Sequence, residues 1–134
     1  MKNPHDIIVK PHITEKSVRL SYGDDASALK RLRNEAKKTG KKAAAVKVEE
    51  KDLVRKYTFI VARDANKIEI KSAIESIYNE GKKGDDAIRV DSVRTVKVLG
   101  KKRRRGFKST GYEADRKKAI VTLAPGQILE DYGV

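Results

Sequence analysis

A strand followed directly by a capped amphipathic helix constrains this fold more than any other feature of the sequence. Residues 57–62 form a β-rich run whose alternation puts three apolar side chains on one face, namely Tyr57, Phe59 and Val61. Asn66 and Glu69 resemble a capping box at a helix start. The residues that follow place an apolar stripe on one side of that helix, made of Ile70, Ala73, Ile74, Ile77 and Tyr78. We therefore expect the strand and the helix to share one hydrophobic core.

Shorter elements surround this unit. The run from Ile7 to Val9 predicts a short edge strand before Pro11. Thr14 is predicted to cap a helix with Glu15 in its first turn, where a negative charge suits the helix dipole. Val18 and Tyr22 lie four residues apart and are expected to share a buried stripe of that helix. Two more strands are predicted near the C-terminus, at residues 90–99 and 118–123.

The order of these elements predicts an α+β fold. We expect a ferredoxin-like two-layer sandwich, with a small, mainly antiparallel sheet and two helices on one face of it. A long basic loop, residues 100–117, is expected between the last two strands. The length of 134 residues suits one domain, residues 1–134.

Residues 23–52 differ from the rest and are predicted to be an exposed insertion. Asp25 is expected to cap a helix that Gly40 ends. The apolar stripe of this helix is only one residue wide, formed by Leu29, Leu32 and Ala36. So narrow a stripe in a highly charged segment predicts little burial against the core.

The charge of the chain is large and uneven. Lys and Arg number 32 and Asp and Glu 19, which gives a net charge of +13. Residues 100–118 hold nine basic side chains against two acidic ones, and so contribute +7 of that excess. A local basic surface of this kind favours a polyanionic partner, either nucleic acid or an acidic membrane surface. The absence of cysteine excludes disulfides and thiolate metal sites, and the sequence contains no run long and apolar enough for a membrane span.

The sequence does not assemble a catalytic constellation. Its only histidines are His5 and His12, with no further ligand nearby to complete a metal site. Paired carboxylates occur only in polar segments, at Asp24-Asp25, Glu49-Glu50 and Asp85-Asp86. We predict that the protein is not an enzyme, and that it has no metal, no cofactor, no small-molecule substrate and no membrane partner.

The basic loop carries the strongest functional signal. Six of the eight residues from Lys101 to Lys108 are cationic, so their mutual repulsion should keep the segment extended until phosphates neutralise it. Arginine grips phosphates in a bidentate fork, and Phe107 and Tyr112 could stack on bases. A solvated charged loop and a localisation tag are the alternatives, and RNA contact is the favoured interpretation. For Glu15, and for Lys67 and Lys71 on one helix face, residue chemistry alone is equally compatible with solvated charges.

Four ordered motifs resemble the bacterial large-subunit ribosomal protein family twenty-three. They cover the chain except for the insertion, and they are residues 7–17 (Ile-Ile-Val-Lys-Pro-His-Ile-Thr-Glu-Lys-Ser), residues 56–71, residues 93–103 and residues 117–126. Two departures stand out. Arg116 occupies a position where the family usually has tryptophan, and the insertion replaces a connection that is normally short.

The resemblance implies a structural constituent of the large ribosomal subunit that is cytoplasmic and ribosome-bound. Such a protein binds large-subunit rRNA, lines the exit of the polypeptide tunnel beside the ribosomal protein of family twenty-nine, and provides a docking site for trigger factor and the signal recognition particle. Glu15 falls on the chaperone-docking glutamate of the family. Together with the basic loop, the resemblance predicts rRNA contacts at Lys16, Lys67, Lys71, Arg94, Thr95, Lys97, Lys101, Lys102, Arg103, Arg104, Arg105, Lys108, Arg116, Lys117 and Lys118.

Two other functions remain as alternatives. Residues 55–61 faintly resemble the aromatic strand of a free RNA-recognition module, although the glycines of that pattern are missing. A small nuclease is the enzymatic alternative, and it needs clustered acids or histidines that the sequence does not provide.

Overall fold

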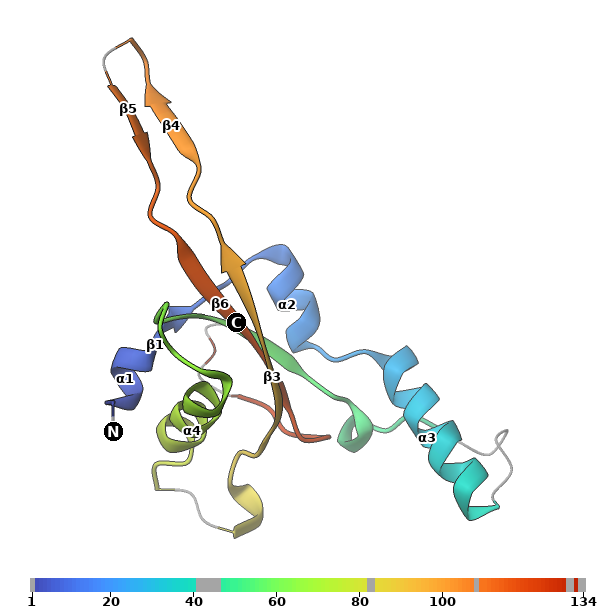
Figure 1. Cartoon of the computed structure of the whole chain (residues 1–134). Helices are drawn as coiled ribbons and strands as arrows, with labels where there is room; N and C mark the ends of the chain where they lie inside the picture. The colour runs from blue at the N-terminus through green and yellow to red at the C-terminus, as the bar shows by residue number, and fades with distance from the viewer. Residues whose placement is uncertain (1, 41–46, 82–83, 108, 130–131, 133–134) are drawn as a thin grey trace.

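A four-stranded antiparallel sheet forms the body of the protein in a computed structural model that describes residues 2–40, 47–81, 84–107, 109–129 and 132. The strand order is β1-β2-β6-β3 (Figure 1), with bounds β1 Ile8–Pro11, β2 Lys56–Val61, β6 Arg116–Leu123 and β3 Val90–Val98. Every neighbouring pair is antiparallel. Strand β1 lies at an edge, which suits Pro11 because proline has no N–H for a second ladder.

Helix α4 (Lys67–Tyr78) packs its apolar stripe on one face of this sheet, as predicted. Ile70, Ala73 and Ile74 are buried there against Phe59 and its neighbours in β2. Asn66 and Glu69 form the expected capping box. Strand β2 crosses the middle of the sheet, and both of its faces are buried beyond its first residue.

Helix α2 (Glu15–Ser21) covers the other face of β2, where Thr58 and Ile60 are buried outside the main core cluster. Thr14 caps this helix as predicted. The predicted stripe of Val18 and Tyr22 is wrong, because Tyr22 is 63% exposed and the buried side chains of α2 are two serines. Serine is small enough for close approach to the sheet, and both hydroxyls donate to carbonyls of the same segment, at Thr14 and Val18.

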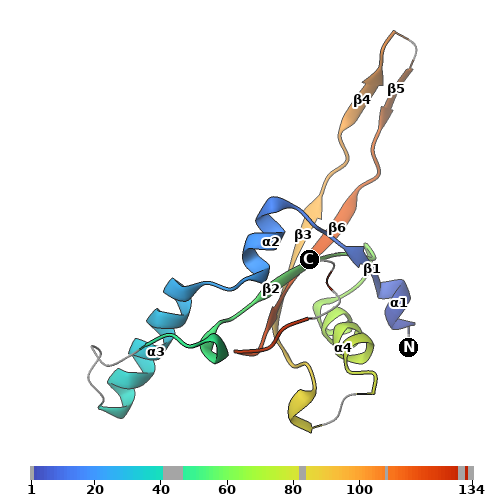
Figure 2. The same cartoon turned by 180° about the vertical axis from the view of Figure 1, so that it is seen from behind.

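The α+β class is thus confirmed: an antiparallel sheet with helices packed on it, plus a small hairpin. The predicted split βαβ unit is present: α4 connects β2 to β3, and these two strands run parallel on either side of β6, which is antiparallel to both. The arrangement differs from the predicted two-layer sandwich in one respect, because α2 and α4 lie on opposite sides of the sheet rather than on one face (Figures 1 and 2).

The C-terminal segment completes the core in a way that the sequence did not predict. Tyr132 is 2% exposed, and its ring makes edge contacts with Tyr57 and Phe59. Its hydroxyl accepts the N–H of Thr58 at 3.0 Å and lies within donating distance of the Thr58 and His12 carbonyls. Tyr132 therefore lies beside β2 at the point where the pairing of β2 with β1 ends.

The remaining helices lie outside the sheet. Helix α1 (Pro4–Ile7) precedes β1, and two 3-10 helices occur at Glu50–Asp52 and Gly84–Asp86. Helix α3 (Asp25–Thr39) extends away from the sheet (Figure 2); its N-cap is Asp24 rather than Asp25, and Gly40 ends it as predicted. None of the helices in the described ranges is long and apolar enough to cross a membrane.

Candidate nucleic-acid interface

The basic segment forms a β-hairpin rather than an unstructured loop. Strands β4 (Lys102–Arg105) and β5 (Ser109–Tyr112) pair antiparallel, with Lys102 opposite Tyr112 and Arg104 opposite Thr110. The hairpin continues the direction of β3 and β6 and projects far from the body (Figure 1). Charge repulsion alone predicts an extended segment without pairing. Backbone hydrogen bonds between two short strands hold the segment together despite that repulsion.

A close backbone approach sets the base of the hairpin. The Gly100 N–H donates to the Asp115 carboxylate at 2.7 Å, and the Glu113 N–H donates to the Lys101 carbonyl at 2.9 Å. A Cβ atom at Gly100 would lie 1.7 Å from the Glu113 carbonyl oxygen, so only glycine fits there. Gly100 is a functional position that sequence reasoning missed, although a glycine directly after a strand is a usable signal.

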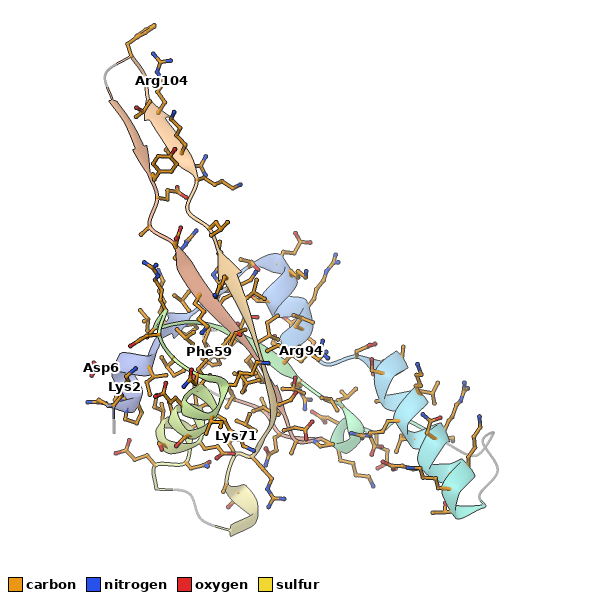
Figure 3. The ribbon with its side chains drawn as sticks, in the orientation of Figure 1. Lys2, Asp6, Phe59, Lys71, Arg94 and Arg104 are labelled. Atoms are coloured by element: carbon orange, nitrogen blue, oxygen red, sulfur yellow. The ribbon has the colours of Figure 1, made fainter. Side chains whose placement is uncertain are left out.

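The described side chains of the hairpin are exposed, in contrast to the aromatic residues of the sheet. Phe107 at the tip is 98% exposed and Tyr112 is 77% exposed, so both rings are free to stack on bases. Lys102 and Arg104 point to the same side of the hairpin as Tyr112, and Arg104 extends outward near the tip (Figure 3). Arg103 points to the other side, and its guanidinium forms an ion pair with Glu113 at 3.1 Å.

The burial of the aromatic side chains in the central strand also excludes an RNA-recognition module. In such a module the aromatic side chains of a central strand must be open to bases. Tyr57 and Phe59 are instead 2% and 1% exposed, beneath α4 and Tyr132. This sheet therefore cannot bind RNA by stacking on its central strand.

A second group of cations lies on the sheet face opposite α4. The register puts Arg94, Lys118 and Arg116 on this face, because their partners alternate with the core residues Ala119 and Val121. Arg94 and Arg116 are exposed and Lys118 is half-buried. The hairpin continues from the same two strands, so the basic residues extend from Arg94 on the body to Arg104 near the hairpin tip (Figure 3).

The pKa of His12 is affected by the positive charge of this face. The backbone N–H of His12 donates to the Thr58 carbonyl at 2.9 Å, which holds the ring beside the end of β1. Partial burial lowers the pKa of His12, and the positive charges of Lys118, Arg116 and Lys10 lower it further. These three cations thus share one neighbourhood, where a phosphate would relieve their repulsion.

Other predicted RNA contacts lie apart from this surface. Thr95 and Lys117 belong to the core side of the sheet, and the Lys117 ammonium donates to the Ala65 carbonyl at 2.7 Å. Lys97 is exposed and lines a hollow on that side together with Asp64.

The helical lysines are equally separate. Lys67 and Lys71 are exposed one turn apart on α4, which packs on the sheet face opposite that of Arg94, and Lys16 is exposed on α2. Lys101 is exposed at the hairpin base. For Arg105 the structure describes the backbone position in β4, and Lys108 lies outside the described residues.

Glu15 occupies the first turn of α2, and 86% of its side chain is exposed. It forms an ion pair with Arg19 at 3.4 Å, and that side chain is also mostly exposed. Such a surface pair contributes little to stability. The carboxylate is therefore available to an incoming cation.

The described part of the chain contains no cluster of three or more acidic, histidine or cysteine side chains that could hold a metal ion. His5 lies in α1, whereas His12 follows β1.

Comparison with known proteins gives one consistent result. A family model described as Ribosomal protein L23 matches residues 6–130. Among similar proteins, the large ribosomal subunit protein uL23 of Pelobacter propionicus is 36% identical over 132 residues, covering 98% of this chain and 99% of that protein. The uL23 proteins of Heliobacterium modesticaldum and Roseiflexus sp. are 35% identical over 130 residues and 38% identical over 128 residues. These two alignments cover 97% and 96% of this chain, and 95% and 94% of the relatives.

Proposed function

The chain belongs to the ribosomal protein L23 family, and we propose that it binds large-subunit rRNA through its basic hairpin and the adjoining basic face of the sheet. As a member of this family it is a structural constituent of the large ribosomal subunit and not an enzyme. The observation that carries the proposal is the hairpin itself, an exposed pair of strands that brings Lys102 and Arg104 to one side with an exposed tyrosine.

Phosphate contact explains why such a hairpin exists. Paired strands without a buried side are marginally stable in water, and like charges along them add repulsion. RNA phosphates would neutralise those charges and release counterions, so binding should be strongly dependent on salt. Basic residues on the sheet face, Arg94 and Arg116 among them, would extend the same contact toward the body.

The test removes two charges from the hairpin without disturbing an internal ion pair. In the Lys102→Gln, Arg104→Gln variant, the slope of log affinity for large-subunit rRNA against log salt should fall by about 1.5, since each phosphate contact contributes roughly 0.7 to 0.9. The control is Lys47→Gln, Arg89→Gln, which removes the same charge from exposed sites elsewhere that form no ion pair with a described residue. An unchanged slope in the hairpin variant, or an equal loss in the control, would refute the proposal.

We further propose that this cytoplasmic, ribosome-bound protein lies at the exit of the polypeptide tunnel beside the family twenty-nine protein, where it provides a docking site for trigger factor and the signal recognition particle. Support comes from Glu15, which stands exposed within the motif that resembles the family's docking sequence. A charge-assisted hydrogen bond to a cationic partner is worth roughly 1.5 to 3 kcal/mol, about ten- to a hundredfold in affinity.

Ribosomes carrying Glu15→Ala should therefore assemble normally and bind trigger factor about ten- to a hundredfold more weakly. Glu80→Ala, which also removes an exposed carboxylate, is the control. Equal chaperone affinities of the two variants would reduce Glu15 to a charge that favours the helix start.

A further inference from the structure

Helix α3 separates its charges sharply from its buried side. Ala28 and Ala36 are buried and Leu32 is half-buried, and these residues repeat every four positions along one side. The opposite side presents Lys30, Arg33 and Lys37 at i, i+3 and i+7, all of them exposed. We call these three residues the α3 basic stripe.

No acid balances the α3 basic stripe. The acids of the helix, Asp25 and Glu35, lie toward its buried side, and Glu35 is paired with Arg31 at 3.9 Å. Among the residues that the structure describes, no ion pair or side-chain hydrogen bond involves a member of the stripe. The stripe is therefore a row of unneutralised cations, about 10 Å long at 1.5 Å rise per residue.

The helix is linked to the segment that returns from it to the body. Arg31 donates to the Asp52 carbonyl at 3.0 Å, which ties α3 to the returning segment of the insertion. That segment is fixed in turn to the C-terminal turn, where the Gly126 N–H donates to the Leu53 carbonyl at 2.9 Å. A Cβ atom at Gly126 would lie 2.8 Å from the Lys51 carbonyl oxygen, so the two segments are in close contact.

Buried Arg55 adds a second attachment. Its side chain is 7% exposed, pairs with Glu50 at 3.6 Å and reaches the Gln127 carbonyl at 3.5 Å. Helix α3 leaves the body in a direction that differs from the hairpin's (Figure 1).

We propose that the α3 basic stripe is a second, separate rRNA-binding surface that contacts the phosphate backbone of an RNA segment different from the one bound by the hairpin. This inference rests on the rRNA binding proposed above. A membrane surface suits the helix poorly, because an interfacial helix must expose an apolar side, and the apolar residues of α3 face the chain itself. Within a ribosomal subunit, the polyanion that complements unpaired cations is RNA.

The first test measures the salt dependence of rRNA binding by the full-length Lys30→Gln, Arg33→Gln, Lys37→Gln variant. Glutamine keeps the helix, because its propensity is close to that of lysine and arginine. The log-log slope should fall by about 2 and affinity in low salt by about tenfold or more. The control, Lys2→Gln, Arg19→Gln, Arg89→Gln, loses the same charge from exposed sites elsewhere and should change the slope by much less.

The second test locates the RNA directly. The chain has no cysteine, so Asn34→Cys, beside the stripe, and Phe107→Cys, at the hairpin tip, each provide a single attachment point for an iron–EDTA cleavage reagent. On assembled subunits, the two positions should cleave rRNA at different sites, and the cysteine-free parent should give no cleavage.

The outcomes separate the two proposals. Cleavage from Phe107→Cys with none from Asn34→Cys, or a triple variant no weaker than its control, would overturn the inference and leave the proposed function standing. If the triple variant lost binding to anionic vesicles but kept its binding to rRNA, the inference would be overturned in favour of a membrane surface. If the parent chain itself failed to bind large-subunit rRNA, the proposed function would fall as well.

Discussion

The two phenylalanines of the chain lie in opposite environments, and the contrast extends to the regions that hold them. Phe59 in β2 is 1% exposed between α4 and Tyr132, whereas Phe107 at the hairpin tip is 98% exposed. The strands β3 and β6 connect the two regions directly (Figure 1). Two successive strand pairs, β3 with β6 and β4 with β5, therefore serve two purposes: stability where apolar side chains face a helix, and contact where charged ones face solvent.

This contrast teaches that sheet formation alone does not create a core. The body buries both faces of its central strand β2, so substitutions there alter packing. The hairpin has backbone pairing without a covered side, so its side chains remain free for a partner. Effects on stability should concentrate in the body, and effects on binding in the hairpin.

The largest difference is expected from truncating each phenylalanine. Phe59→Ala should reduce the free energy of unfolding by about 3 to 5 kcal/mol, because it leaves a cavity in a packed core. Phe107→Ala should change it by less than about 0.5 kcal/mol. Denaturant unfolding of both variants measures the difference. Similar losses would mean that the hairpin tip packs against the body in solution.

The tyrosines provide a smaller test of the same contrast. Tyr132→Phe should cost about 1 to 3 kcal/mol, because the Thr58 N–H loses its partner in a buried place. Tyr112→Phe removes an equivalent hydroxyl from an exposed site and should have almost no effect on unfolding. If Tyr132→Phe proved neutral, the hydrogen bonds of the Tyr132 hydroxyl would not contribute to the stability of the core.

The boundary between the regions can be tested at Gly100. Gly100→Ala should open the hairpin base, at a local cost of about 1 to 3 kcal/mol, because the new Cβ has no room beside Glu113. Faster amide exchange at Glu113 with little change in global unfolding is the expected result. Gly111→Ala is the matched control, since nothing lies within 4 Å of its Cβ position. Equal exchange in both variants would contradict the close approach.

The smallest expected effect is a difference in amide hydrogen exchange between the body and the hairpin of the free protein. Amides of β2 and β6 should exchange only through opening that approaches global unfolding, whereas those of β4 and β5 should open at little cost. Native-state hydrogen exchange distinguishes the two. Strong protection of β4 and β5 without RNA would show that the hairpin is stable without a partner.

The sequence by itself determined the local elements of this protein. The capping residues Thr14 and Asn66, the stripe of α4 and the alternation in β2 were all predictable, because they depend on neighbours within a few residues. Charge counting likewise located the basic segment. These signals, with the four family motifs, were enough for the α+β class and the family.

Only the tertiary structure decided how these elements meet. The strand order, the placement of α2 opposite α4 and the burial of Ser17 in place of Tyr22 depend on contacts between distant segments. The clearest case is Tyr132, whose hydroxyl meets Thr58 across 74 residues of sequence. The same holds for the basic residues: local spacing could not tell Lys117, which is bound to a core-side carbonyl, from Arg116, which is exposed beside it. Adjacent residues of a strand face opposite sides, and only the packing of the sheet decides which side is covered.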